Sequence, residues 1–201
     1  MEFDVLIIGG GAAGMSCALI LGSALEKDFA KYKKVGIVMH QKTSHLQTAL
    51  FNNVLGVPAG TSGEKILKEG SIHLAENYPK VVQIQKEKVK EIVSRKEGFR
   101  VITNKDIYSA KKVVVAVGYI NSLTIKGLEE YIIPHKKTKA SKKRIQLKNE
   151  DHLVKANLYV AGTISGCRSQ FAIACGSGAS VATDILTDWN REHTMVHDKL
   201  V

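Results

Sequence analysis

The chain has few cysteines and few prolines, with three of each among its 201 residues. Cys17, Cys167 and Cys175 are too few and too irregularly spaced for a disulfide framework, which favours a reducing cytoplasm as the location. No apolar run reaches the ~18 residues that a membrane-spanning helix needs. The N-terminus begins directly with a strand-like segment and lacks the charged and long apolar regions of a signal peptide. These absences argue against a secreted or membrane protein.

Metal-ligand and nucleophile signatures are also missing. His45, His73, His135 and His152 are scattered, and no cysteine or acid stands beside them at ligand spacing, so we expect no metal site. The segment Gly176-Ser177-Gly178 lacks the GxSxG spacing of a hydrolase nucleophile. The sequence therefore gives no sign of a metalloenzyme or a serine hydrolase.

Negative charge is absent between residues 135 and 148. The whole chain carries a net charge of +10, and this segment contributes Lys136, Lys137, Lys139, Lys142, Lys143, Arg144 and Lys148. Three interpretations are open: a solvated, mobile basic loop, a docking patch for an acidic protein, or a nucleic-acid contact. Only one aromatic residue, Tyr131, lies nearby. Without the stacking array of single-strand binders, nucleic acid is the weakest interpretation.

The N-terminal segment carries the most informative pattern. Val5 to Ile8 form an apolar run that leads into Gly9-Gly10-Gly11-Ala12-Ala13-Gly14, and an Ala-rich apolar stretch follows. In this strand, turn and helix, Gly9 permits the tight turn, Gly11 lets the backbone approach a diphosphate, and Gly14 lets the helix lie against the strand. The helix N-terminus would point its N–H groups at the phosphates. The pattern predicts dinucleotide binding, and a purely structural glycine-rich turn is the alternative.

Later apolar segments extend this pattern over most of the chain. Strands are expected at 35–39, 81–85, 113–117 and 158–161, and helices at 61–78 and 170–189. Ser62 can cap the first of these helices. Short segments at 89–93, 99–103 and 107–110 are separated by turn residues and indicate a three-stranded antiparallel meander.

Strands that alternate with helices favour an α/β fold with a parallel sheet, in which the helices cover one face and the meander covers the other. A ligand is expected at the carboxyl ends of the strands, where Gly9, Met39, Gly118 and Gly162 fall. The length allows one domain, which we place at 1–190, followed by a polar tail at 191–201.

Four segments carry a more specific pattern. They are FDVLIIGGGAAG at 3–14, Asn53-Val54-Leu55-Gly56 followed by Thr61-Ser62-Gly63, VVVAVG at 113–118, and LYVAGTISGCRSQFAIACGSGASVA at 158–182. Together they resemble the FAD domain of thioredoxin reductase and its relatives in the pyridine nucleotide–disulfide oxidoreductase superfamily. The first and last segments are the specific ones. The resemblance implies a Rossmann-like FAD/NAD(P)-binding fold with FAD as the cofactor.

In that family a complete NADPH-binding domain lies between the counterparts of 113–118 and 158–161, and it carries a redox-active Cys-x-x-C. Here a short Lys-rich segment, 119–157, fills that place. It has no second glycine-rich loop and is too short for a second Rossmann unit, and no two cysteines have the Cys-x-x-C spacing. The resemblance thus implies the FAD half of such an enzyme on its own, rather than a self-sufficient thioredoxin reductase.

The resemblance also assigns residues to the cofactor. The pyrophosphate would lie at Gly9, Gly11, Ala12, Ala13 and Gly14. Further contacts would come from Met39, His40 and Gln41 at the ribose, Val89 at the adenine, Asn53 near the flavin, and Ala116, Gly118, Gly162, Thr163, Ser169, Gln170 and Phe171 along the remaining length. The helix that starts near Gln170 would point its positive end at the flavin, where negative charge collects on reduction.

Two positions depart from the family pattern. Superfamily members often place a carboxylate after the second strand, where it accepts hydrogen bonds from the ribose, but this chain has Met39-His40-Gln41-Lys42. Lys42 and Ser44 would suit a 2′-phosphate, which keeps NADP, or no cofactor at all, as alternatives to FAD. Thr163 stands where the family has an aspartate that bonds the ribityl chain. A threonine hydroxyl still offers one such bond.

The cysteines carry separate interpretations. Cys167 precedes the last expected helix, where a thiol can be activated as a nucleophile toward flavin or a disulfide, and the alternative is an ordinary small loop residue. Cys17 and Cys175 fall among small apolar residues within expected helices, so we interpret both as packing residues. Cys167 is therefore the one candidate catalytic residue.

The sequence thus predicts a single-domain, FAD-dependent oxidoreductase that is reduced by a partner protein or by a free nicotinamide nucleotide. The basic segment would dock an acidic redox protein through Lys136, Lys137, Lys139, Lys142, Lys143 and Arg144. The alternative is a non-catalytic FAD- or NADP-binding regulatory or sensor module. From the resemblance we also expect a homodimer.

Overall fold

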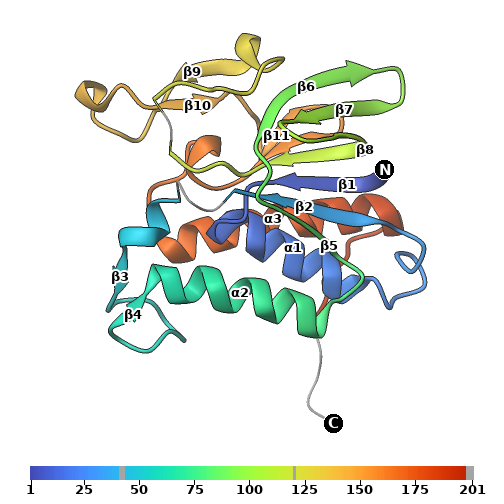
Figure 1. The fold of residues 1–201 in the computed structure, drawn as a ribbon, viewed down its shortest axis with the longest axis horizontal. Helices are drawn as coiled ribbons and strands as arrows, with labels where there is room; N and C mark the ends of the chain where they lie inside the picture. Colours follow the sequence, from blue (N-terminus) through green and yellow to red (C-terminus); the bar gives the residue numbers. More distant parts are fainter. Residues whose placement is uncertain (41–43, 120, 198–201) are drawn as a thin grey trace.

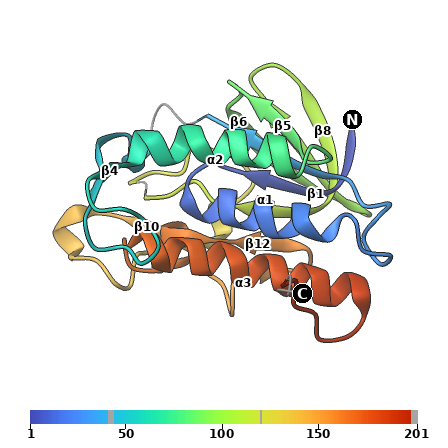
Figure 2. The ribbon, with the colours of Figure 1, turned by 90° about the horizontal axis from the view of Figure 1, so that it is seen from below.

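A central β-sheet separates three helices on one face from short strands on the other (Figure 1). The computed structural model describes residues 1–40, 44–119 and 121–197. The helices are α1 (Ala12–Ala24), α2 (Gly63–Asn77) and α3 (Phe171–Asn190). Seen from below, α1 lies between α2 and α3 (Figure 2). This arrangement confirms the predicted α/β class, with helices on one face of the sheet.

The sheet runs in the order β11-β12-β8-β1-β2-β5. These strands are β1 (Glu2–Ile8), β2 (Val35–Met39), β5 (Val82–Gln85), β8 (Ile107–Val115), β11 (Leu153–Lys155) and β12 (Leu158–Val160). Every neighbouring pair along this order is parallel except β11 with β12. The carboxyl ends of the parallel strands therefore meet at one edge of the sheet, where α/β proteins bind ligands.

One strand differs from the sequence prediction. Segments 107–110 and 113–117, expected as separate strands, are replaced by the single strand β8. β7 (Gly98–Thr103) pairs antiparallel with the first part of β8, and β12 pairs parallel with its last part. Two strands thus occupy the same edge of β8 in succession. β6 (Val89–Arg95) pairs with β7 and completes a meander that shares its third strand with the main sheet.

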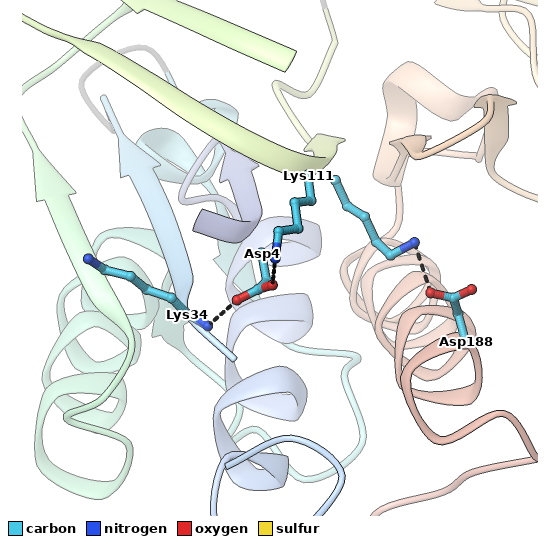
Figure 3. Close-up of polar contacts among 5 residues, drawn as sticks. Asp4, Lys34, Lys111 and Asp188 are labelled. Atoms are coloured by element: carbon cyan, nitrogen blue, oxygen red, sulfur yellow. Dashed lines mark hydrogen bonds and ion pairs between the residues drawn. The ribbon is translucent and has the colours of Figure 1, made fainter. Parts of the chain in front are cut away.

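Charged contacts explain why β8 continues through Lys111 and Lys112, which resemble a polar break in the sequence. The ammonium of Lys111 lies 3.0 Å from the carboxylate of Asp4, and this carboxylate also accepts the backbone N–H of Lys34 at 2.8 Å (Figure 3). Lys112 is buried and lies 2.9 Å from Asp188 of α3. Burial raises the pKa of Asp4, but these contacts with Lys34 and Lys111 outweigh burial and hold the pKa below its ordinary value.

The hydrophobic core has two parts because both faces of the sheet are covered. Along β1, Val5 and Ile7 pack on the helix side, whereas Leu6 and Ile8 pack on the meander side. Successive strand residues point to opposite faces, so a strand covered on both sides is apolar at every position. This explains the continuous apolar run that precedes the glycine-rich turn.

The basic segment forms a short hairpin rather than a plain loop. β9 (Ile132–Pro134) pairs antiparallel with β10 (Ile145–Leu147), and the 3-10 helix η4 (Ala140–Lys142) lies between them. The exposed basic residues between β9 and β10 are Lys136, Lys137, Lys139, Lys142 and Lys143. Arg144 is only half exposed, and the buried Gln146 accepts the backbone N–H of Lys136 at 2.9 Å. Buried residues at both strand ends thus fix the lysine-bearing loop to the fold.

The remaining short elements complete the chain. They are η2 (His45–Thr48), β3 (Leu50–Phe51), β4 (Thr61–Ser62), η3 (Glu129–Tyr131) and η5 (Gly162–Ser165). As predicted, Ser62 caps α2, because its hydroxyl accepts the backbone N–H of Lys65 at 3.2 Å. None of the helices within the described ranges combines the length and apolar character needed to cross a bilayer.

Candidate functional site

Glycines shape the turn between β1 and α1. Gly9 has a φ of +114°, and a Cβ at this position would collide with the carbonyl of Ala116. A Cβ on Gly14 would collide with the carbonyl of Gly9, so this glycine lets α1 pack directly on the strand end. Gly11 instead faces open space, since a Cβ there would meet only the Ser44 hydroxyl, at 3.9 Å. The backbone therefore folds back tightly and leaves room in front of the helix.

A cavity of about 620 Å³ opens at the carboxyl ends of the strands. Cavities that bind small molecules and cofactors commonly measure ~300–1,000 Å³. Residues expected from the sequence that line it are Gly9, Gly11, Ala12, Ala13, His40, Asn53, Val89, Ala116, Gly118, Gly162, Thr163, Ser169, Gln170 and Phe171. One continuous cavity thus brings together segments that are far apart in the chain.

Other expected site residues lie away from the cavity wall. Gly14 lies beneath the turn, where it serves the packing of α1. The side chain of Met39 is buried in the helix-side core, because Met39 alternates along β2 with Val38, which does line the cavity. Cys167 is not part of the wall, and its Sγ lies 3.3 Å from the hydroxyl of Ser165. Gln41, and Lys42 of the NADP alternative, lie outside the described residues.

Two helix N-termini face the cavity without a side-chain cap. Gly11 precedes α1 and Gln170 precedes α3, and neither contributes a capping side chain. Neither helix has an acidic residue in its first turn. By contrast, α2 begins with the Ser62 cap and carries Glu64 in its first turn. The positive ends of α1 and α3 are therefore left for an anionic or electron-rich ligand.

One end of the cavity is formed where β2 and β5 finish. These strands are parallel, with Met39 opposite Gln85, so the residues that follow them emerge side by side. His40 follows β2, and Glu87 lies in the segment after β5, and both line the cavity. The apolar side chain of Val89 lies in the same wall. We call this the nucleoside end, because the family resemblance of the sequence predicts the ribose near His40 and the adenine near Val89.

The opposite end is built by η5 and the start of α3. Thr163 is buried and lines the cavity, and its backbone carbonyl lies 3.0 Å from Nε2 of His135. Nδ1 of His135 accepts the backbone N–H of Lys137 at 3.1 Å, which leaves Nε2 as the donor to Thr163. The rings of Phe51 and Phe171 lie 4.9 Å apart in the cavity wall. This end therefore combines a fixed backbone turn with aromatic surface.

An aromatic residue links the hairpin to the cavity. Tyr119 lines the cavity, and its backbone carbonyl lies 3.2 Å from Nε2 of His45. The guanidinium of Arg144 stacks on the Tyr119 ring, and the ring of the buried His135 packs against the same aromatic ring in a tilted orientation. The sequence prediction treated Arg144 only as part of a charged patch. In the structure, Arg144 is half-buried and contacts the cavity wall through the Tyr119 ring.

The remaining cysteines lie in packing positions, and burial raises the pKa of both the Cys17 and the Cys175 thiols. Cys17 is fully buried in the helix-side core, and Cys175 is half-buried on α3. Among the described residues, no three histidine, cysteine or acidic side chains gather as a metal site would require.

Several wall residues were missed by sequence reasoning. Glu87 and Tyr119 follow the ends of β5 and β8, and residues 122–125 lie beside the start of β6, since the N–H of Ile92 donates to the carbonyl of Lys126 at 2.9 Å. Glu87 had a signal, because an acid just beyond a parallel strand lies at the ligand-binding edge. The 122–125 segment had none, because its place depends on pairing across the chain.

The chain belongs to the pyridine nucleotide-disulphide oxidoreductase family, whose model matches residues 3–181. Its fold is similar to that of a thioredoxin reductase from Gloeobacter violaceus, with a TM-score of 0.73, 16% identity, and coverage of 100% of this chain and 99% of that chain. It is also similar to that of a thioredoxin reductase from T. acidophilum, with a TM-score of 0.67, 18% identity, and coverage of 93% of this chain and 98% of that chain. A ferredoxin-flavin thioredoxin reductase from Clostridium acetobutylicum has a TM-score of 0.67 and 16% identity, and the match covers 95% of this chain and 99% of that chain. No curated protein matches the chain.

Proposed function

We propose that the chain is a single FAD-binding domain of an oxidoreductase that receives its electrons from outside the chain. The observation that carries this proposal is the cavity that joins the uncapped N-termini of α1 and α3. The N-terminus of α1 would bind the pyrophosphate, and the N-terminus of α3 would face the flavin ring system. When bound, FAD would supply the two-electron redox chemistry that side chains lack.

The residues present fit such a cofactor along most of its length. The open space at Gly11 allows a diphosphate to approach the backbone of the turn. At the nucleoside end, Val38 and Val89 offer apolar surface for a base. At the other end, Thr163 offers a short, neutral hydroxyl where the family has an aspartate. We therefore retain FAD as the proposed cofactor.

The proposed electron donor is an acidic redox protein or a free nicotinamide nucleotide. The lysines of the η4 hairpin are exposed, and none of them forms an ion pair within the described ranges. The hairpin reaches the cavity wall through His135 and Arg144, so a protein docked there would lie close to the site. The name of the Clostridium acetobutylicum neighbour is consistent with a protein donor.

A FAD- or NADP-binding regulatory or sensor module is the second candidate. One observation favours it: among the described residues, no cysteine lines the cavity. A thiol relay between a bound cofactor and a disulfide substrate would need such a residue. Under this alternative, nucleotide binding rather than turnover is the function.

We also propose that the protein works in the cytoplasm as a homodimer. Leu50, Leu55 and Ile173 are 63%, 102% and 40% exposed, although all three are large and apolar. They stand on segments that border the cavity, where a second copy would remove them from water. Analytical ultracentrifugation tests this proposal, and a monomer at micromolar concentration would contradict it.

The test of the main proposal is the visible absorption spectrum of the purified chain, followed by anaerobic reduction. A flavin band near ~450 nm would support the cofactor. Bleaching by NADPH or NADH would identify nicotinamide as a direct donor, and bleaching only by reduced ferredoxin or flavodoxin would identify a protein donor. Flavin that none of these reduces would favour the sensor module. A colourless protein that takes up no FAD would contradict the proposal.

A further inference from the structure

The nucleoside end of the cavity contains a carboxylate that comes from an unexpected strand. No acid follows β2 in the sequence, where the family often has one. Glu87 follows β5 instead, and β5 is the direct parallel neighbour of β2. Glu87 and His40 follow neighbouring strand ends, and both line the cavity. The fold thus places an acid beside the position that lacks one.

Two hydroxyl groups hold the carboxylate of Glu87 in place. Thr103 donates to it at 2.6 Å, and Tyr108 lies 3.1 and 3.2 Å from its two oxygens. Both donors are 6% exposed and come from the meander strands β7 and β8. Burial, together with the bond to Glu87, raises the pKa of Tyr108 to about 12, so the hydroxyl stays protonated as a donor.

The anchored carboxylate keeps part of its hydrogen-bonding capacity. Both of its anchors are neutral, and Glu87 forms no ion pair within the described ranges. An ionised carboxylate has about four acceptor positions, and the two hydroxyls use only some of them. Lys88 lines the same cavity, but its side chain is exposed and forms no ion pair within the described ranges. Among the described residues at this end, Glu87 is therefore the acid whose position is fixed by hydrogen bonds.

We propose that Glu87 sets the nucleotide specificity of the cavity: its carboxylate accepts hydrogen bonds from the ribose hydroxyls of adenosine and repels a 2′-phosphate. The inference rests on the proposed dinucleotide-binding function. A fixed negative charge disfavours a phosphate at close range, whereas a hydroxyl in the same place is a hydrogen-bond donor. The site would then accept FAD or another unphosphorylated adenine nucleotide and discriminate against NADP.

The test compares ADP with 2′-phosphoadenosine 5′-diphosphate, which differs from ADP only by the 2′-phosphate, on the full-length protein as purified. Displacement is followed by the fluorescence of released flavin if FAD is bound, and by titration calorimetry if it is not. We expect the wild-type chain to prefer ADP by about ten- to a hundredfold, the range given by one close charge contact. Glu87→Gln keeps the size and loses the charge, so the preference should fall by about tenfold.

Two further variants separate specificity from structure. Glu97→Gln removes the same charge from the exposed turn between β6 and β7, and it should leave the preference unchanged. Tyr108→Phe removes one anchor but keeps the carboxylate charge, so the preference for ADP should persist even if both nucleotides bind more weakly.

Distinct outcomes would overturn the inference. An equal preference in the wild type and Glu87→Gln would overturn the role of Glu87 and leave the cavity's proposed function intact. Loss of the preference in Tyr108→Phe as well would show that the effect is structural, and this also overturns the role. A chain that binds neither nucleotide and no FAD would overturn both the inference and the proposed function.

Discussion

The guanidinium carbon of Arg144 lies 3.9 Å from the ring centre of Tyr119, and Tyr119 lines the cavity. The ring of His135 lies 5.3 Å from the same aromatic ring, and its Nε2 lies 3.0 Å from the carbonyl of Thr163. The basic hairpin therefore contacts the cavity wall through two side chains as well as through its charge. A change on the hairpin is expected to reach the site directly.

Replacement of Arg144 tests this link. Arg144→Ala removes a cation–π contact worth about 0.5–2 kcal/mol, so we expect FAD to bind about two- to thirtyfold more weakly. Arg144→Lys keeps the charge but loses the planar stacking surface, so its affinity for FAD should lie between those of the wild type and Arg144→Ala. Fluorescence quenching of FAD on titration with protein measures the affinity. Wild-type affinity in a folded Arg144→Ala protein would show that Tyr119 needs no support from the hairpin.

Charge reversal on the hairpin tests the docking surface. The triple variant Lys136→Glu, Lys137→Glu and Lys139→Glu should slow reduction by an acidic donor at low ionic strength by about tenfold or more, because electrostatic steering is lost. The difference should shrink as salt is added. Stopped-flow absorbance measures the rate. The matched control carries Lys27→Glu, Lys96→Glu and Lys105→Glu, which are exposed elsewhere. Equal rates in both triple variants would remove the hairpin as the docking site.

A pair of helix glycines tests the packing of the turn. Gly14→Ala places a methyl group against the carbonyl of Gly9 and should lower the free energy of unfolding by about 1–3 kcal/mol, with weaker binding of the proposed FAD. Gly176→Ala, on α3, meets no atom within 4 Å and should stabilise the protein by about 0.5–1 kcal/mol. Urea unfolding measures both. A Gly14→Ala protein as stable as the wild type would contradict the close approach of α1.

Asp4 gives a pH-dependent contribution to stability. Contacts with Lys34 and Lys111 hold its pKa in the folded chain below the ordinary value of 3.8. The stabilisation is therefore present above 3.8 and is lost as the pH falls through the lower folded value. Asp4→Asn should cost about 1–3 kcal/mol at neutral pH, and this difference should shrink in acid. Asp28→Asn is the control, since that side chain is 97% exposed. A difference that does not change with pH would contradict the assignment.

Much of the fold could be predicted because its signals are local. The apolar run before Gly9, the cap at Ser62 and the small residues of α3 each mark an element through its own sequence. The parallel sheet follows from the alternation of these elements. The break expected in β8 was wrong because Asp4 and Asp188, which pair with Lys111 and Lys112, are far away in the sequence.

The candidate site was predictable where backbone shape decides it, and less so where side chains meet across the fold. Gly9 and Gly11 lie in the cavity wall, and the motif predicts this because it specifies glycine, the residue with no side chain, at both positions. Glu87 depends on hydroxyls from two other strands, and Tyr119 depends on the hairpin. Such contacts follow from three-dimensional pairing, which a single sequence does not specify.

The pairing of β8 with β12 has a consequence for how the chain is assembled. Val115 lies opposite Val160, and the N–H of Ala161 donates to the carbonyl of Val115 at 2.9 Å. The chain leaves β8 at Val115 and re-enters the sheet at Leu153 of β11, which lies opposite Tyr159 of β12, and Tyr159 in turn lies opposite Val114 of β8. The segment between them therefore begins and ends at the same edge of the sheet. The entropy of closing such an excursion grows only slowly with its length. A much longer segment at this junction would therefore cost little more closure entropy than the short hairpin does.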